Sequence, residues 1–475
     1  MTVSSHHPDY DEFREEWRLC RDAYRGEQAI KENGTRYLPM PGGFKAQSDG
    51  GVGMYSSYVA RAQFPSIMPM TIAGMVGVIH RAESQIEMPD AMSAIWEKAT
   101  PDGIPLEVFH RRITTELLIA GRYGLLVDVR PGEATPLIAG YVAETVINWD
   151  PDGSLIVLDE TDYVRTNFTW VEQPAWRTLM LDDAGNYVQA LYDYENAAGG
   201  EPINPTAAGG NALDFLPFIV ANARDMRLDP ESPPLIGVAR SAKNIYQLSA
   251  DYRWQLFMTG QETLFVINAD APDVVGAGVT VTLKGGDGLT PDAKYVGPAG
   301  TGIAAHRVAI QDERHAAVAA GAKMFESAGG GDESGEALRL RYAAETATLT
   351  TIAQTSAAAL EKALRYVAIM MGLNPEAVIV KPNLQFVDTK MSPQEAQALV
   401  KVWQDGAISY ETLYGNLQAG EIASAERDAE EELALIDDED EQRRPSPIEA
   451  GIMVAQPSGE AANEETDGDA VESSA

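Results

Sequence analysis

The spacing of apolar residues between Pro233 and Thr263 predicts one long helix. Apolar or small side chains recur there every three or four residues, at Leu235, Val238, Ala242, Ile245, Ser249, Tyr252 and Leu256. We expect Ser232 to cap the amino end, Pro233 to take the first helical position and Gly260 to end the helix. At 1.5 Å per residue, roughly 26 residues form a rod of about 40 Å, which is long for a globular enzyme.

The first half of the chain alternates between helical and strand patterns. Residues 9–81 predict helices around a loop at Asn33–Gly53, and Leu106–Ala120 predicts an amphipathic helix that ends at Gly121. A buried strand follows at Gly124–Val129. An antiparallel meander comes next, with strands at Ser154–Leu158, Val164–Val171, Arg177–Leu181 and Tyr187–Tyr194 and a hairpin turn at Asp182–Asn186.

The second half is mainly helical. Strands are predicted at Leu264–Ile267, Val279–Leu283 and Ile379–Val387, and helices at Val308–Phe325, Ala337–Met371, Ser392–Gln404, Ser409–Gly420 and in an acidic stretch to Ile436. Glu326–Glu336 cannot hold a helix, because its three consecutive glycines each cost about 1 kcal/mol relative to alanine. From Asp437 onward the polar, acidic composition predicts disorder.

Composition narrows the class of protein. The chain has 475 residues, enough for several subdomains, and no apolar run long enough to span a membrane. Its amino terminus lacks the basic and apolar segments of a secretory signal, and the single Cys20 fits a reducing cytosol. A protein that grips duplex DNA needs a basic footprint, and this chain, with a net charge of −35, offers no basic domain. The charge serves solubility, or it lets DNA slide past a channel wall without sticking.

The sequence contains no motif for catalysis or for a cofactor. A phosphate-binding loop needs a lysine after its glycines, whereas Gly329–Gly331 leads into Asp332 and Glu333, which would repel phosphate. The six histidines are scattered, apart from His6 and His7 in an amino terminus that we expect to be loose. We therefore expect no enzyme activity, no cofactor and no metal.

Several segments, taken in order, resemble the portal proteins of tailed bacteriophages, in a branch long filed as a domain of unknown function. The similar segments are YVARAQF (58–64), GMVG (74–77), GRYGLLVD (121–128), YVAETVINW (141–149), NIYQLSADY (244–252), ETA (345–347) and GAISYET (406–412). No single segment is diagnostic, but their joint order covers about residues 10 to 436.

The resemblance implies an α+β portal fold that assembles as a cyclic ring. Its parts would be amino-terminal helices and a mixed α/β wing (1–232), a first stem helix (233–263), a clip (264–307), a second stem helix (308–325), a tunnel loop (326–336), a long channel helix (337–372), a wing return strand (373–390), a helical crown (391–436) and a disordered acidic tail (437–475).

The resemblance also implies a function and partners. The chain would form a head–tail connector, a ring of about twelve copies at the portal vertex of the virion, assembled in the host cytoplasm. Double-stranded DNA would be packaged and ejected through it without sequence specificity. A terminase motor, head-completion adaptors, and major capsid and scaffolding proteins would be its partners, with no membrane.

Two sets of residues would carry this function. In the tunnel loop they are Gly329, Gly330, Gly331, Asp332, Glu333 and Glu336, which combine backbone freedom with charge that repels DNA. On the first stem helix Leu248, Tyr252 and Leu256 would make contacts between subunits. The alternatives are an acidic cytosolic enzyme with an unrecognised site, and another virion structural protein such as a minor capsid or scaffolding component.

Overall fold

The computed structural model describes most of the chain. The described residues are 2–129, 135–193, 202–260, 263–275, 282–284, 286, 288–297, 300, 302–321, 335–384, 386, 393–419, 422–424 and 427–443, of which 263, 335–346, 393–395, 419 and 440–443 are described by their backbone alone. The chain divides into two compact units, Met1–Phe386 and Val387–Ala475.

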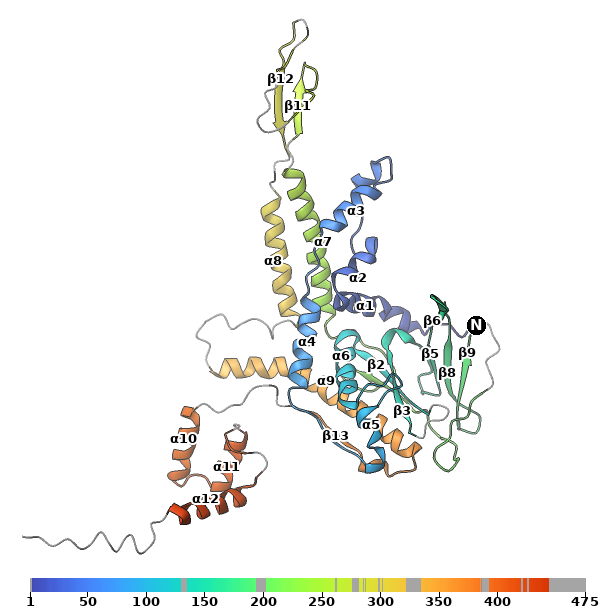
Figure 1. Cartoon of the computed structure of the whole chain (residues 1–475), viewed down its shortest axis with the longest axis vertical. Coiled ribbons are helices and arrows are strands. Elements are labelled where there is room, and N and C mark those ends of the chain that lie inside the picture. The colour runs from blue at the N-terminus through green and yellow to red at the C-terminus, as the bar shows by residue number, and fades with distance from the viewer. Residues whose placement is uncertain are drawn as a thin grey trace, which may run out of the picture. The chain divides into compact units, whose positions relative to one another are not determined.

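The first unit is an α+β assembly (Figure 1). Its helices are α1 (Pro8–Arg25), α2 (Glu27–Glu32), α3 (Val52–Arg61), α4 (Ile67–Ile79), α5 (Ala94–Glu97), α6 (Leu106–Ala120), α7 (Ile236–Thr259), α8 (Ile303–Ala319) and α9 (Gly335–Met370). Its strands are β1 (Gln85–Glu87), β2 (Arg122–Asp128), β3 (Leu137–Val142), β4 (Val146–Trp149), β5 (Leu155–Asp159), β6 (Asp162–Thr166), β7 (Thr169–Gln173), β8 (Trp176–Leu181), β9 (Tyr187–Tyr192), β10 (Phe218–Asn222), β11 (Thr263–Ile267), β12 (Asp292–Val296) and β13 (Ile379–Lys381).

The two larger antiparallel sheets share one core with the helices. A four-stranded sheet has the order β4-β5-β8-β9, and a three-stranded sheet has the order β10-β2-β3. The other pairs are β1–β13, β6–β7 and β11–β12. The central strand β2 is buried over almost its whole length, and α6 and α9 pack against it.

Local signals placed several elements correctly. Helix α6 spans Leu106–Ala120 as predicted, and Gly121 follows it at a left-handed φ of 73°. In the predicted turn, the backbone N–H of Asp182 donates to the Asn186 carbonyl oxygen at 2.8 Å. Gly372 ends α9 at φ 70°. These positions have strong local preferences, which explains their agreement with the sequence.

The start of α7 and the amino terminus differ from expectation. The N-cap of α7 is Leu235, without a side-chain hydrogen bond, and the Ser232 hydroxyl donates instead to Glu16 Oε2 at 2.5 Å. A hydrogen bond to a charged carboxylate is stronger than one to a neutral backbone group, so the distant partner wins. His7, expected in a loose segment, accepts from Asp9 N–H as the N-cap of α1 and stacks on Trp149.

Three strands differ from their predicted ranges or pairing. The strand predicted at Val164–Val171 is the hairpin β6–β7, because Asn167 tolerates its left-handed φ of 58° and apolar alternation continues through the turn. β11 pairs with Asp292–Val296 and not with Val279–Leu283, of which 279–281 lie outside the described residues. β13 ends at Lys381, because Pro382 has no N–H to continue the ladder.

Two further helices of the first unit, α8 and α9, have shifted ends. α8 begins at Ile303, ahead of Val308, because alanine is the best helix former, and residues 322–325 of that prediction lie outside the described part. α9 already includes Gly335 and Glu336, since an acidic residue in the first turn complements the helix dipole.

The second unit contains α10 (Pro393–Gln404), α11 (Tyr410–Ala419) and α12 (Ala429–Arg443). Ser409, at which the sequence predicts a helix to start, caps α11 by accepting the Thr412 N–H at 3.2 Å. α12 continues to Arg443 instead of ending at Ile436, because glutamate, glutamine and arginine are good helix formers. The rest of the expected tail lies outside the described residues.

Candidate functional site: the α7–α8 stem and its apolar flank

Helices α7 and α8, here called the stem, form an antiparallel pair (Figure 1). Near its middle, Asn244 Nδ2 donates to Glu313 Oε1 at 3.2 Å. At one end the absent side chain of Gly237 leaves room for Ala320, since a Cβ there would come within 2.8 Å of the alanine Cβ. These contacts hold the two helices close together in one register.

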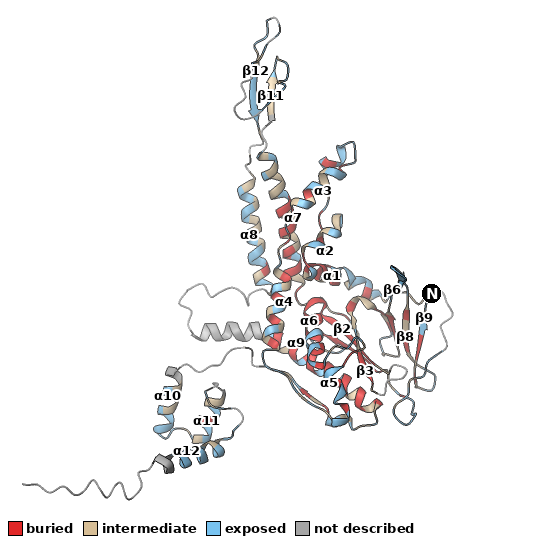
Figure 2. Cartoon of the chain, viewed as in Figure 1, coloured by how far each residue is buried: buried red, intermediate tan, exposed pale blue. Residues whose placement is uncertain are grey.

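The predicted apolar face of α7 is buried along one half of the helix and uncovered along the other (Figure 2). Val238, Ala242 and Ile245 belong to the core, whereas Tyr252 on the same face is half-buried and Leu256 is 40% exposed. A continuous apolar stripe that loses its cover halfway along a helix marks a surface that a partner can bury.

A second face of the same half is firmly packed. The ring of Trp254 lies 5.1 Å from that of Phe44 and 6.0 Å from that of Tyr58. The Arg61 guanidinium sits 3.8 Å from the Phe257 ring centre, and the Tyr58 hydroxyl donates to Asp251. The outer half of α7 is therefore held rigidly by α3, although its apolar stripe is open.

A hollow of about 380 Å³ lies beside the uncovered stripe. Leu256, Arg253 and Arg61 line it, together with Ala60, Gln63 and Glu27. Of the predicted subunit contacts, Leu256 reaches this hollow, while Leu248 and Tyr252 are half-buried elsewhere on α7. The approach of residues 60–63 to α7 is long-range, so no local pattern in the sequence predicts it.

The segment between α7 and α8 exposes more apolar surface. The strands β11 and β12 form a two-stranded hairpin, and such a hairpin is only marginally stable alone. Large side chains that are about half exposed or more are Phe265, Val274, Leu289, Tyr295, Val296 and, at the start of α8, Val308. Scattered exposed residues are ordinary, but a band of this kind along one segment indicates a contact surface.

The predicted tunnel-loop residues are largely outside the described chain. Gly329, Gly330, Gly331, Asp332 and Glu333 fall in that part, and Glu336 lies in the first turn of α9. Their role in a channel therefore stays a prediction.

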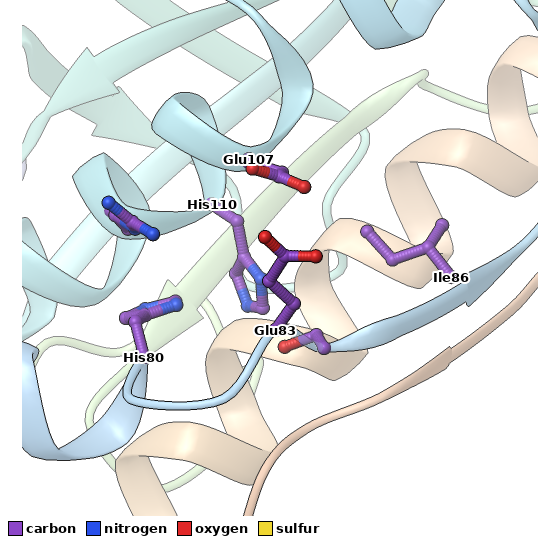
Figure 3. Close-up of a pocket in the computed structure, with 7 residues that line it drawn as sticks. His80, Glu83, Ile86, Glu107 and His110 are labelled. Carbon is purple, nitrogen blue, oxygen red and sulfur yellow. The ribbon is translucent and has the colours of Figure 1, made fainter. Parts of the chain in front are cut away.

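A histidine pair lies in the core of the same unit, between α4, α6 and α9 (Figure 3). The imidazoles of His80 and His110 meet edge to face, with ring centres 4.9 Å apart. His80 Nε2 is 2.9 Å from Thr114 Oγ1, and His110 Nε2 is 3.3 Å from Ser356 Oγ. The adjoining hollow of about 20 Å³ has room for roughly one water molecule and none for a substrate.

Burial keeps both histidines neutral. It lowers the pKa of His80 to about 4, with a further contribution from Arg111, and it lowers the pKa of His110 to about 3, with a further contribution from His80. The pair therefore acts as a polar clamp between helices at neutral pH. The sequence offered no sign of it, because its members are distant along the chain.

Within the described ranges, no group of three histidine, cysteine, aspartate or glutamate side chains is arranged to hold a metal ion. A helix that is both long enough and apolar enough to cross a membrane is likewise not found among these residues.

One known protein family matches the part of the chain that contains the stem. A family described as a domain of unknown function, DUF4055, matches residues 234–371, which contain α7, α8 and α9 together with their connections. No curated protein matches the chain.

Solved structures with some similarity come from gene transfer agent (GTA) particles. A chain from the neck of the native particle, computed with C12 symmetry, is 13% identical, covers 74% of this chain and 89% of its own length, and has a TM-score of 0.38. A chain from the native virion is 14% identical over 83% and 98%, with a TM-score of 0.41. A chain from the neck of the empty particle, computed with C6 symmetry, is 12% identical over 80% and 95%, also with a TM-score of 0.41.

Proposed function

We propose that this chain is a portal protein, a subunit of the ring through which a phage genome enters and leaves the capsid. The observation that carries the proposal is the outer half of the stem, where an ordered apolar stripe ends in an open hollow beside Leu256. An isolated subunit leaves this surface in water, whereas a neighbouring copy would cover it.

The open flank favours a head-to-tail contact between copies. The hollow beside α7 carries Arg61 and Arg253, while the exposed side of α8 offers small residues around Val308, which is 60% exposed. We propose that α8 of one copy packs on the α7 flank of the next. Two different surfaces in contact make a heterologous interface, which closes into a ring when the rotation allows it.

The order of elements supports the finer assignment. A helix, an apolar hairpin segment, an antiparallel helix, a glycine-rich acidic stretch and a 36-residue helix follow one another, in the order of stem, clip, stem, tunnel loop and channel helix. We propose a ring of about twelve copies, non-enzymatic, with DNA sliding through an acidic lumen. The terminase, adaptor, capsid and scaffolding partners belong to the same proposal, as does location in the virion.

Electron microscopy of the purified full-length chain tests the function directly. We expect class averages of rings with a central hole. Compact monomers at micromolar concentration and physiological salt would overturn the proposal and favour the acidic-enzyme alternative. A non-annular assembly would favour a different virion structural protein.

A further inference from the structure

The hairpin β6–β7, residues 162–173, here called the arm, exposes large apolar side chains on both faces. Phe168 at its tip is fully exposed, and Tyr163, Val164, Trp170 and Val171 are each exposed by 47–62%. Val164 pairs with Val171 in the ladder, whereas Tyr163 pairs with Glu172 on the opposite face. All ten strand residues of the arm are exposed (Figure 2).

The base of the arm is fixed. It continues the buried β5–β8 pair, and the Glu160 backbone N–H donates to the Ala175 carbonyl oxygen at 2.8 Å. Arg177 binds Glu160 at 2.8 Å and Asp128 at 3.1 Å, with each side chain mostly buried. A rigid base presents the arm in one direction, but a two-stranded ribbon with nothing against it is marginal in water. A partner that covers the arm would therefore stabilise it.

One helix of the same unit carries a matching surface. Arg14, Arg18, Arg21 and Arg25 recur at helical spacing on α1 and line a hollow of about 490 Å³, here called the α1 groove. Tyr10 and Val142 add an apolar wall. A hollow of this volume lies in the range that accommodates a group of several side chains.

Three of the four arginines in the groove are paired with carboxylates of the same chain. Arg14 pairs with Asp11, Arg18 with Glu15, and Arg21 with both Glu116 and Glu144. A nucleic-acid strand needs uncompensated cations, and a net charge of −35 repels it further. A guanidinium that is paired in its plane still offers its face to an aromatic ring. The groove therefore suits an aromatic protein segment better than a polyanion.

We propose that the arm of one copy of this chain docks in the α1 groove of the neighbouring copy. Trp170, Tyr163 and Phe168 would stack on the arginine planes, and Glu172 would complement Arg25, for which the described part of the structure gives no ion pair. This proposal rests on the proposed ring. It adds a second head-to-tail contact, remote in sequence from the stem.

Cysteine cross-linking tests the docking. Cys20 is buried and burial raises its pKa, so introduced cysteines are the reactive ones. A tagged Phe168→Cys chain is co-expressed with an untagged Arg18→Cys chain, and purified rings are oxidised mildly. The matched control replaces Arg18→Cys by Glu12→Cys, an exposed position on a different face of α1.

We expect a mixed disulfide between chains with Arg18→Cys and at least about tenfold less with Glu12→Cys. Rings that yield no disulfide, or equal amounts with both, would overturn the docking while the ring itself stands. Absence of rings in the unmodified protein would instead remove the proposed function. If the cysteine variants form no cross-link and Arg18→Glu lowers the retention of DNA by rings, the groove binds nucleic acid and the docking is wrong.

A second variant separates docking from folding. Trp170→Asp places a charge on the arm at a side chain that is 62% exposed in its own subunit. We expect an unchanged thermal unfolding midpoint of the monomeric fraction and a ring-association constant lower by about tenfold or more. Unchanged association would overturn the proposal.

Discussion

Acidification should destabilise the first unit through His110. This side chain is 3% exposed, and its pKa is held at about 3 against an ordinary value of 6.5, mainly because burial disfavours the charged imidazolium. The unfolded chain takes up the proton near pH 6.5, whereas the folded chain stays neutral until about pH 3. The contribution of neutral His110 to stability is therefore fully present above pH 6.5, and it is lost as the pH falls from 6.5 toward 3.

The size of the effect follows from the window. Each pH unit below 6.5 removes about 1.4 kcal/mol from the free energy of unfolding until the folded pKa is reached. At pH 5 the loss attributable to His110 is about 2 kcal/mol. Glu83, Glu107 and Arg111 line the same hollow, and the neighbouring His80 further lowers the pKa of His110.

The assay compares unfolding by urea at pH 7 and pH 5, at one protein concentration. His110→Gln keeps a donor for Ser356 but cannot take up a proton, so it removes the linkage while leaving the shape similar. The many surface carboxylates contribute equally to both proteins and cancel in the difference. His315→Gln on α8, an exposed position, is the control for loss of any histidine.

We expect the original protein to lose about 2 kcal/mol more than His110→Gln between the two pH values, and His315→Gln to behave like the original. The reasoning is refuted if His110→Gln shows the same pH dependence as the original protein. In that case the imidazole would have found a charge partner or solvent in the folded state.

Three other predictions concern assembly and DNA passage. Leu256→Asp should abolish rings seen by electron microscopy without unfolding the subunit, because Leu256 is 40% exposed, and intact rings would mean that the stripe is not an interface. Replacing Asp332, Glu333 and Glu336 by lysine should leave rings intact but slow genome packaging in a salt-dependent way, and normal packaging would remove this stretch from the DNA path. Truncation after Arg443 should preserve ring mass by light scattering, and loss of the oligomer would show that the last residues are structural.

Elements defined by neighbouring residues were predictable from the sequence. Periodicity located α6 and the buried half of α7, and turn chemistry located the hairpin at Asp182–Asn186. The break between β6 and β7 was missed because Asn167 turns the chain without interrupting apolar alternation. Each of these outcomes depends on a preference that acts over a few residues.

Surfaces built from distant segments were not predictable. The hollow beside Leu256 needs residues 60–63, and the α1 groove needs Val142 and Glu144 next to α1. Nothing in a single sequence reports that such segments meet. The histidine clamp was not predictable for the same reason, because Ser356 lies 246 residues after His110 in the chain.

Charge and apolar surface act in opposite directions on assembly. Each copy carries a net charge of −35, so bringing copies together costs electrostatic free energy that only partly disappears at physiological salt, where the Debye length is about 8 Å. Exposed ion pairs contribute about 0–1 kcal/mol each and cannot offset this repulsion. Burial of apolar surface is the remaining source of favourable free energy for assembly, at about 25 cal/mol per Å². The uncovered stripe of α7, the segment between α7 and α8 and the exposed arm all offer such surface, and we expect the stripe and the arm at contacts between copies.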